Sequence, residues 1–345
     1  MKQCYNWLTF DIIGDLAFGE PFGAVEKAES HPWVTTIQDG LFDAIFYDVF
    51  RRVPLLKLWP TLLRPANVAA QRLEQFKNSR IRVERRMQQD NDRDDFFSQL
   101  LSEKATDLTP DFLTAQANTL IIAGSETTAT FLTGKSQPTL SFKSSRTESR
   151  AGATYYLLRN PATLHHLTNE IRTSFKDSSL INGDTTQSLP YLNAVIEESL
   201  RIFPPVPDGL QRTTPSPGAY VSSHYIPGGT TVSVSGWSLT HSPTYFHKPR
   251  EFRPERWLPR DHELYDEAFD ADVKDASKPF SVGPRACLGI NLAYLEMRII
   301  LATICWEFDL EWGVGGERVE WERDVRLRFL WQKPELRVRF TPAVR

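Results

Sequence analysis

Hydrophobic positions in the first half of the chain recur at helical spacing. Trp7, Phe10 and Ile13, with either Ala17 or Phe18, fall on one face and Gly19 follows them, so the spacing predicts an opening amphipathic helix. Thr109, Pro110 and Asp111 are typical of the first turn of a second helix. Hydrophobic periodicity and proline positions together predict helices over residues 31–50, 67–90, 96–101, 110–132, 162–175, 189–203 and 288–308.

After Pro205 the pattern changes to turns and short alternating runs. Residues 219–236 predict a β-hairpin around Pro227–Gly229, residues 250–278 predict a long polar loop, and residues 326–340 predict a terminal hairpin. The predicted fold class is therefore mainly α with a small β component late in the chain.

Residues 134–151 do not fit their surroundings. Seven of the 18 are Ser or Thr, four are Lys or Arg, and helical periodicity is absent, although it is present on both sides. If the segment is deleted, the two flanking helical patterns join without a break. We therefore expect residues 134–151 to be an aberrant insertion, with a retained intron as the hypothesis and a surface insertion as the alternative.

Composition excludes several classes of protein. The chain of 345 residues is 41% hydrophobic and 24% charged, so it is neither disordered nor fibrous, and its length fits either two domains or one large fold. A net charge of -3 excludes the strongly basic footprint of a dedicated nucleic-acid binder. Three cysteines exclude a disulfide framework and a cysteine-rich zinc site, and the seven histidines lack metal-ligand spacing. No apolar run is long enough for a membrane span, and residues 1–20 lack the charged-then-apolar pattern of a signal peptide.

The segment FSVGPRACLG, residues 280–289, carries the strongest chemical signal. Cys287 directly precedes an apolar helix, whose backbone N–H groups and dipole favour a thiolate. Arg285 adds a positive charge two residues away, Gly283 permits a tight turn, and Gly289 permits close approach of the backbone. Such a loop suits an anionic sulfur bound to a metal; the alternative is a buried structural cysteine.

Two further motifs are ambiguous on their own. Glu198 and Arg201 lie three apart on one helical face, where such a pair is usually a weak surface ion pair. Gly124 interrupts an apolar helix in AGSETT, residues 123–128, at a cost of about 1 kcal/mol relative to alanine. Close helix packing, with Thr127 bonding back to the Ala123 carbonyl, would explain that glycine.

Taken together, these motifs resemble the cytochrome P450 monooxygenases, and the similarity extends over the whole chain. Phe280, Gly283, Arg285, Cys287 and Gly289 match the haem-binding loop of that family position for position. The resemblance implies that Glu198 and Arg201 form a buried structural triad with Arg256 of FRPERW. It also implies that AGSETT is the distal helix, where Gly124 leaves room for dioxygen and the catalytic residues Glu126 and Thr127 relay protons to it.

The same resemblance implies a haem b whose iron is bound by Cys287, with Arg212 and Arg285 pairing with the propionates. Electrons would come from NADPH through a partner reductase at the endoplasmic reticulum membrane. The substrate would be a lipophilic small molecule that is hydroxylated, epoxidised or desaturated. The phrases GLQRTTP and IPGGTTVSV are similar to fungal enzymes of secondary metabolism. By position, substrate contacts are expected from residues 42–58, 112–123, 206–211 and 329–332.

One departure from the family concerns the beginning of the chain. Members of the family begin with a membrane anchor, sheet strands and a helix that bears a Trp-x-x-x-Arg pair, and none of these precedes Cys4. We therefore expect residues 1–345 to be a single cytochrome P450 domain that lacks its N-terminal part. The alternatives to an active monooxygenase are an inactive remnant or mis-assembled gene product that cannot hold haem, and a helical scaffold with no cofactor.

Overall fold

The computed structural model describes residues 2–29, 66–88, 109–132, 152–328, 330–332, 334 and 336–344. The chain divides into two compact units, Met1–Ala151 with Trp312–Val338 and Gly152–Glu311 with Arg339–Arg345. The predicted helices over 31–50 and 96–101, and the segment 134–151, lie outside the described residues.

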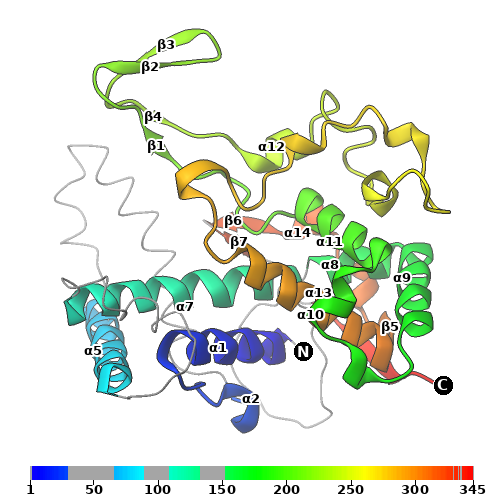
Figure 1. Ribbon diagram of the computed structural model, residues 1–345, viewed down its shortest axis with the longest axis horizontal. Coiled ribbons are helices and arrows are strands. Elements are labelled where there is room, and N and C mark those ends of the chain that lie inside the picture. The colour runs from blue at the N-terminus through cyan, green and yellow to red at the C-terminus, as the bar shows by residue number, and fades with distance from the viewer. Residues whose placement is uncertain are drawn as a thin grey trace. The chain divides into compact units, whose positions relative to one another are not determined.

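The described part of the first unit contains three long helices. They are α1 (Lys2–Phe18), α5 (Ala66–Gln88) and α7 (Pro110–Leu132), and α1 and α5 both pack against α7 (Figure 1). Short α2 (Ala24–Lys27) follows α1 and is held by Asp11, whose carboxylate accepts hydrogen bonds from the backbone N–H groups of Ala24 and Val25. The core of this unit comprises Phe10, Ala17, Phe18, Phe22, Val83, Leu113, Ala117 and Ile121.

Helix α7 begins as the sequence predicts. The Thr109 hydroxyl accepts a hydrogen bond from the Phe112 backbone N–H at 3.2 Å, and the Thr109 carbonyl accepts one from Leu113 at 3.1 Å. Thr109 is therefore the N-cap, and Pro110, which has no N–H to satisfy, occupies the first helical position.

The second unit is organised around α11. Its helices are α8 (Ala153–Arg159), α9 (Pro161–Ser174), α10 (Gly183–Gln187), α11 (Pro190–Ile202), α12 (Gly236–Thr240) and α13 (Ile290–Glu307). Ten of the 13 residues of α11 are buried, because α8, α9, α12 and α13 all pack against it. Glu170 of α9 caps its first turn, since the carboxylate accepts hydrogen bonds from the N–H groups of Tyr191 and Leu192, each at 2.8 Å.

Within the described residues, the strands form four two-stranded sheets. Their bounds are β1 (Arg212–Thr213), β2 (Gly218–Val221), β3 (His224–Pro227), β4 (Thr231–Val232), β5 (Phe308–Trp312), β6 (Arg326–Arg328), β7 (Leu330–Gln332) and β8 (Val338–Pro342), paired β1 with β4, β2 with β3, β5 with β8 and β6 with β7. The tail predicted as a hairpin thus pairs β6 with β7, whereas β8 pairs with β5. The prediction of a mainly helical fold with a small β component is confirmed.

The predicted position of the central hairpin turn is wrong. The turn between β2 and β3 lies at Ser222 and Ser223, and Tyr220 pairs with Tyr225 across it (Figure 1). Both serines have positive φ, 46° and 66°, a conformation usually taken by Gly or Asn, so the local sequence did not indicate it. The glycines at 228 and 229 instead lie between β3 and β4.

Short turns connect the remaining segments. The predicted polar loop at 250–278 contains 3-10 turns at Pro254–Trp257, Glu267–Phe269 and Lys274–Ala276; another lies at Gly316–Arg318, before α14 (Trp321–Asp324). Among the helices that the structure describes, none combines the length and apolar character needed to span a bilayer.

Candidate haem-thiolate site

The loop that carries Cys287 is closed by its own backbone. The Cys287 N–H donates to the Phe280 carbonyl at 2.8 Å, and the Ala286 N–H donates to the Gly283 carbonyl at 2.9 Å. Gly283 has a φ of 74° and no atom lies within 4 Å of where its Cβ would be, so glycine suits this position because of conformation and not because of space. Ser281 has a φ of 60°, so the same loop contains a second residue in the left-handed conformation, which is unfavourable for serine.

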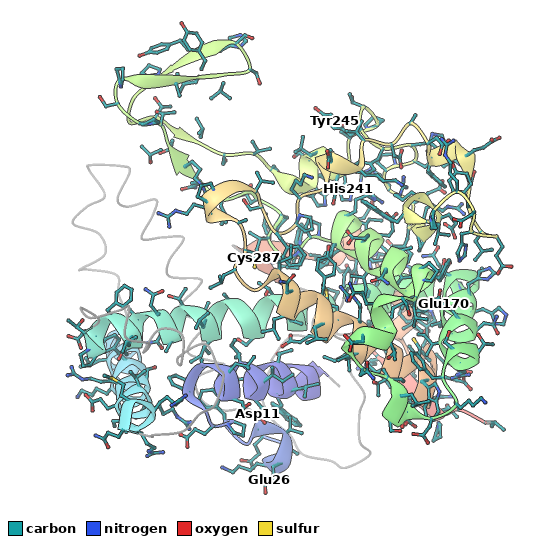
Figure 2. The ribbon with its side chains drawn as sticks, in the orientation of Figure 1. Asp11, Glu26, Glu170, His241, Tyr245 and Cys287 are labelled. Atoms are coloured by element: carbon teal, nitrogen blue, oxygen red, sulfur yellow. The ribbon has the colours of Figure 1, made fainter. Side chains whose placement is uncertain are left out.

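Cys287 lies where this loop meets α13 (Figure 2). Its thiol is free and exposed, two residues before Gly289, the N-cap whose carbonyl accepts the Ala293 N–H at 2.9 Å. The sulfur is therefore near the positive end of an 18-residue helix and accessible to a ligand. A Cβ at Gly289 would meet only the Cys287 Sγ, at 4.0 Å, so the described chain itself does not require a glycine there.

The other free cysteine in the described residues provides a contrast. Cys305, on α13, is completely buried, and burial raises the pKa of its thiol to about 12. It is thus a poor source of thiolate, so of these two described thiols Cys287 is the candidate ligand.

Glu198, Arg201 and Arg256 come together as a fully buried cluster. Arg201 donates to both carboxylate oxygens of Glu198, at 2.7 and 2.8 Å, and the Arg256 Nε lies 3.0 Å from Glu198 Oε2. Burial alone would raise the pKa of Glu198, but the two guanidinium groups outweigh it and hold that pKa below its usual range. Arg201 also donates to the carbonyls of Thr240, Pro249 and Glu251, so the cluster fixes the backbone that follows α12.

Sequence reasoning missed two members of this cluster. The Trp257 indole donates to Glu198 Oε2 at 2.9 Å, and Asp272 pairs with Arg256. Trp257 directly follows Arg256, so its inclusion could have been suspected. Asp272 lies 16 residues after Arg256, in the polar loop, and no local sequence pattern indicates that it would join the cluster.

On α7, the geometry around AGSETT matches the packing interpretation. A Cβ at Gly124 would lie 2.8 Å from Cδ1 and 2.9 Å from Cγ1 of Ile13, on α1. The Thr127 hydroxyl donates to the Ala123 carbonyl at 2.6 Å. The side chain of Glu126 lies outside the described residues. The proton-relay role of Glu126 and Thr127 therefore stays a prediction.

The two arginines predicted to meet the propionates are both exposed. Arg212 lies on β1, where its Nη1 donates to the Gln211 carbonyl at 2.9 Å, and Arg285 lies in the 3-10 turn Gly283–Arg285. Among the described residues, no group of three or more His, Cys, Asp or Glu side chains lies close enough together to hold a metal ion.

Comparison with known proteins decides the family. The family model described as Cytochrome P450 matches residues 1–133 and 151–340. The chain belongs to this family. It is 44% identical to cytochrome P450 monooxygenase BOA3 of Botryotinia fuckeliana, over 99% of this chain and 64% of the relative. It is 36% identical to the trichothecene C-15 hydroxylase of Fusarium sporotrichioides, over 99% and 65%, and to the averantin hydroxylase of Aspergillus parasiticus, over 98% and 64%.

As a cytochrome P450, the chain spans slightly less than two thirds of the length of these curated relatives. Family membership implies haem iron, and the donors present fit it. One exposed thiol lies at a helix N-terminus on a loop closed by backbone hydrogen bonds, and exposed guanidinium groups are present to meet carboxylates.

Proposed function

We propose that the protein is a haem-thiolate monooxygenase that oxidises a lipophilic small molecule in fungal secondary metabolism. The observation that carries this proposal is the exposed Cys287 thiol at the start of α13, on a loop whose backbone is closed at Phe280. The buried cluster around Glu198 supports it, because it ties α11 to the 249–257 segment within the same unit.

In this proposal Cys287 would hold the iron of haem b through its sulfur. Haem with a thiolate ligand supplies the activation of dioxygen for oxidation of C–H bonds. Phe280, Gly283 and Gly289 shape the loop, and Arg285 and Arg212 bind the propionate carboxylates as charge-assisted donors. The chain's own task is to keep the sulfur anionic and to hold its orientation.

Glu126 and Thr127 are proposed to deliver protons on the distal side. The Thr127 hydroxyl donates its hydrogen to the Ala123 carbonyl, so the hydroxyl oxygen is still able to accept a hydrogen bond. A Thr127→Val variant would keep the size and shape of the side chain while removing that oxygen. We expect it to consume NADPH with less product formed per NADPH, which product analysis alongside NADPH oxidation would measure.

Hydroxylation is the proposed reaction, because two of the relatives named above are hydroxylases. Electrons are proposed to come from NADPH through a separate reductase, at the surface of the endoplasmic reticulum. The proposed substrate is a lipophilic small molecule, and metabolite profiles after deletion of the gene would identify the compound that accumulates.

The test of haem ligation is a reduced carbon monoxide difference spectrum of the expressed chain. We expect a thiolate-type band that disappears in Cys287→Ser. Cys305→Ser is the matched control, because it removes a buried thiol on α13, the helix that follows the Cys287 loop, and should keep the band. Absence of the band from the unmodified chain would favour the inactive remnant, and its persistence in Cys287→Ser would rule out the assigned ligand.

A further inference from the structure

A tyrosine and a glutamate connect the cysteine loop to the centre of its unit. Tyr294 lies in the second turn of α13, and its hydroxyl donates to Glu197 Oε1 of α11 at 2.6 Å. On the other side its ring lies against Phe280, with 5.1 Å between ring centroids and 45° between the planes. Neither Tyr294 nor Glu197 has been assigned a role so far.

This contact reaches the residue that closes the loop. The Phe280 carbonyl accepts the Cys287 N–H at 2.8 Å, so the residue whose ring packs on Tyr294 also holds the backbone of the cysteine. A chain of direct contacts therefore runs from α11 to Cys287, through Glu197, Tyr294 and Phe280. All of its members lie in one compact unit.

The charges around Tyr294 make the contact a strong one. Burial raises the pKa of Glu197 above its usual value, although the hydrogen bond from Tyr294 and the charge of Arg298 oppose this rise. The Arg298 guanidinium lies 5.5 Å from the centre of the Tyr294 ring, within range of a cation–π interaction. A partly buried carboxylate that accepts a short hydroxyl hydrogen bond fixes the ring more firmly than packing alone would.

Glu197 is adjacent to Glu198, and the two carboxylates act on different segments. Glu198 holds Arg201, Arg256 and the backbone N–H of Arg253, whereas Glu197 holds α13 beside the cysteine loop. One turn of α11 thereby determines the position of two separate segments.

We propose that Tyr294 and Glu197 are positioning residues that hold Phe280, and through its carbonyl the Cys287 backbone, so that the sulfur keeps one orientation. The consequence for haem rests on the proposed function, in which Cys287 is the ligand. The consequence for the loop itself does not, because it concerns a hydrogen bond within the chain.

Hydrogen–deuterium exchange of the full 345-residue chain, prepared without haem, tests the loop directly. Tyr294→Phe keeps the ring but removes the hydroxyl, and Glu197→Ala removes its acceptor. Loss of a hydrogen bond to a charged group shifts the equilibrium for local opening of the loop by about tenfold. Because amides exchange from the open form, we expect the peptide that contains the Cys287 amide to exchange about tenfold faster in both variants. Glu197→Gln retains an acceptor oxygen and should restore most of the protection.

Tyr191→Phe is the matched control. Tyr191 is also on α11, and its hydroxyl also donates to a carboxylate, Glu255 Oε1, at 3.4 Å. Its ring lies against His166 and His262 and not against the cysteine loop. The control should therefore leave exchange at Cys287 unchanged. The proposal is overturned if the peptide that contains Cys287 exchanges no faster in Tyr294→Phe and Glu197→Ala than it does in Tyr191→Phe.

The haem-loaded chain gives a second measurement. In the reduced carbon monoxide spectrum, Tyr294→Phe should shift part of the signal from the thiolate-type band to the protonated-thiol band, and Tyr191→Phe should not. If the unmodified chain shows no thiolate-type band, the proposed function fails while the exchange experiment still decides the role of Tyr294. If the band is present and identical in all variants, Tyr294 does not orient the sulfur.

Discussion

Glu198 is the residue on which most of the buried charge in the second unit depends. It accepts hydrogen bonds from Arg201 and Arg256, which are both fully buried, and from the Trp257 indole. Buried ion pairs contribute little net stability because both charges lose their hydration. Removing the charge of Glu198 is a different matter, because Arg201 would stay buried without its carboxylate partner and Arg256 would keep only Asp272.

Glu198→Gln is therefore expected to lower the free energy of unfolding by about 3–5 kcal/mol, the usual cost of stranding a buried charge. Urea unfolding followed by circular dichroism would measure the change. Glu251→Gln is the matched control: Glu251 pairs with Arg253 at 2.8 Å but both side chains are about half exposed, so the change should be under about 1 kcal/mol. Equal effects from the two substitutions would contradict the charge argument.

The lowered pKa of Glu198 also predicts how stability depends on pH. A carboxylate whose folded pKa lies below its ordinary value of 4.5 stabilises the fold above that pH, and the contribution is lost as pH falls through the folded pKa. The difference in unfolding free energy between the unmodified chain and Glu198→Gln should thus be constant near neutral pH and shrink below about pH 4.5. Urea titrations at pH values from 7 to 3 would measure it, and a constant difference would contradict the assignment.

At the scale of elements, α1 and α7 approach closely because Gly124 has no side chain. The Ile13 carbon atoms occupy the space in which a Cβ would lie, and Ile13 is itself 3% exposed, so it has little room to move. Gly124→Ala gains helix propensity worth about 1 kcal/mol, but overpacking typically costs about 1–3 kcal/mol.

We therefore expect Gly124→Ala to be destabilising overall by about 1 kcal/mol, and to be stabilising when Ile13 is first changed to Ala. Thermal unfolding of the four members of this double-mutant cycle would measure the coupling. Additive effects would show that the glycine is not required by helix packing, and would favour its role in leaving space for dioxygen.

The turn of the β2–β3 hairpin has a backbone conformation that serine does not favour. Ser222 and Ser223 both have positive φ, which is compatible with the turn but disfavoured for residues with a Cβ. Replacing them by Asn and Gly should stabilise the chain by about 0.5–1 kcal/mol. Ser178→Gly, in the 3-10 turn Ser178–Leu180, is the control and should not stabilise; calorimetry of both variants would decide.

At the scale of the whole molecule, local patterns were sufficient for the longer helices that the structure describes, but not for short α2, α10 and α12. Thr109, Pro110 and the apolar spacing of α7, α11 and α13 are local signals, and the helices begin within two residues of the predicted positions. Contacts between distant segments left no such signal. Asp272 beside Arg256, and Glu197 beside Tyr294, are separated by 16 and 97 residues and become neighbours only in the folded unit.

Residues 134–150 interrupt the match to the family model. The family model matches up to residue 133 and resumes at residue 151, and helical structure is described up to Leu132 and again from Ala153. We expect deletion of residues 134–151 to raise the melting temperature and the fraction of chains that bind haem, because the two flanking helical patterns then join directly. Transcript sequencing should find a major message without this segment.

Deletion of 18 residues from another position, 259–276 in the loop that supplies Asp272, is the control and should lower both the melting temperature and the fraction of chains that bind haem. A major message that retains the segment, together with a less stable deletion variant, would establish it as a genuine part of the protein.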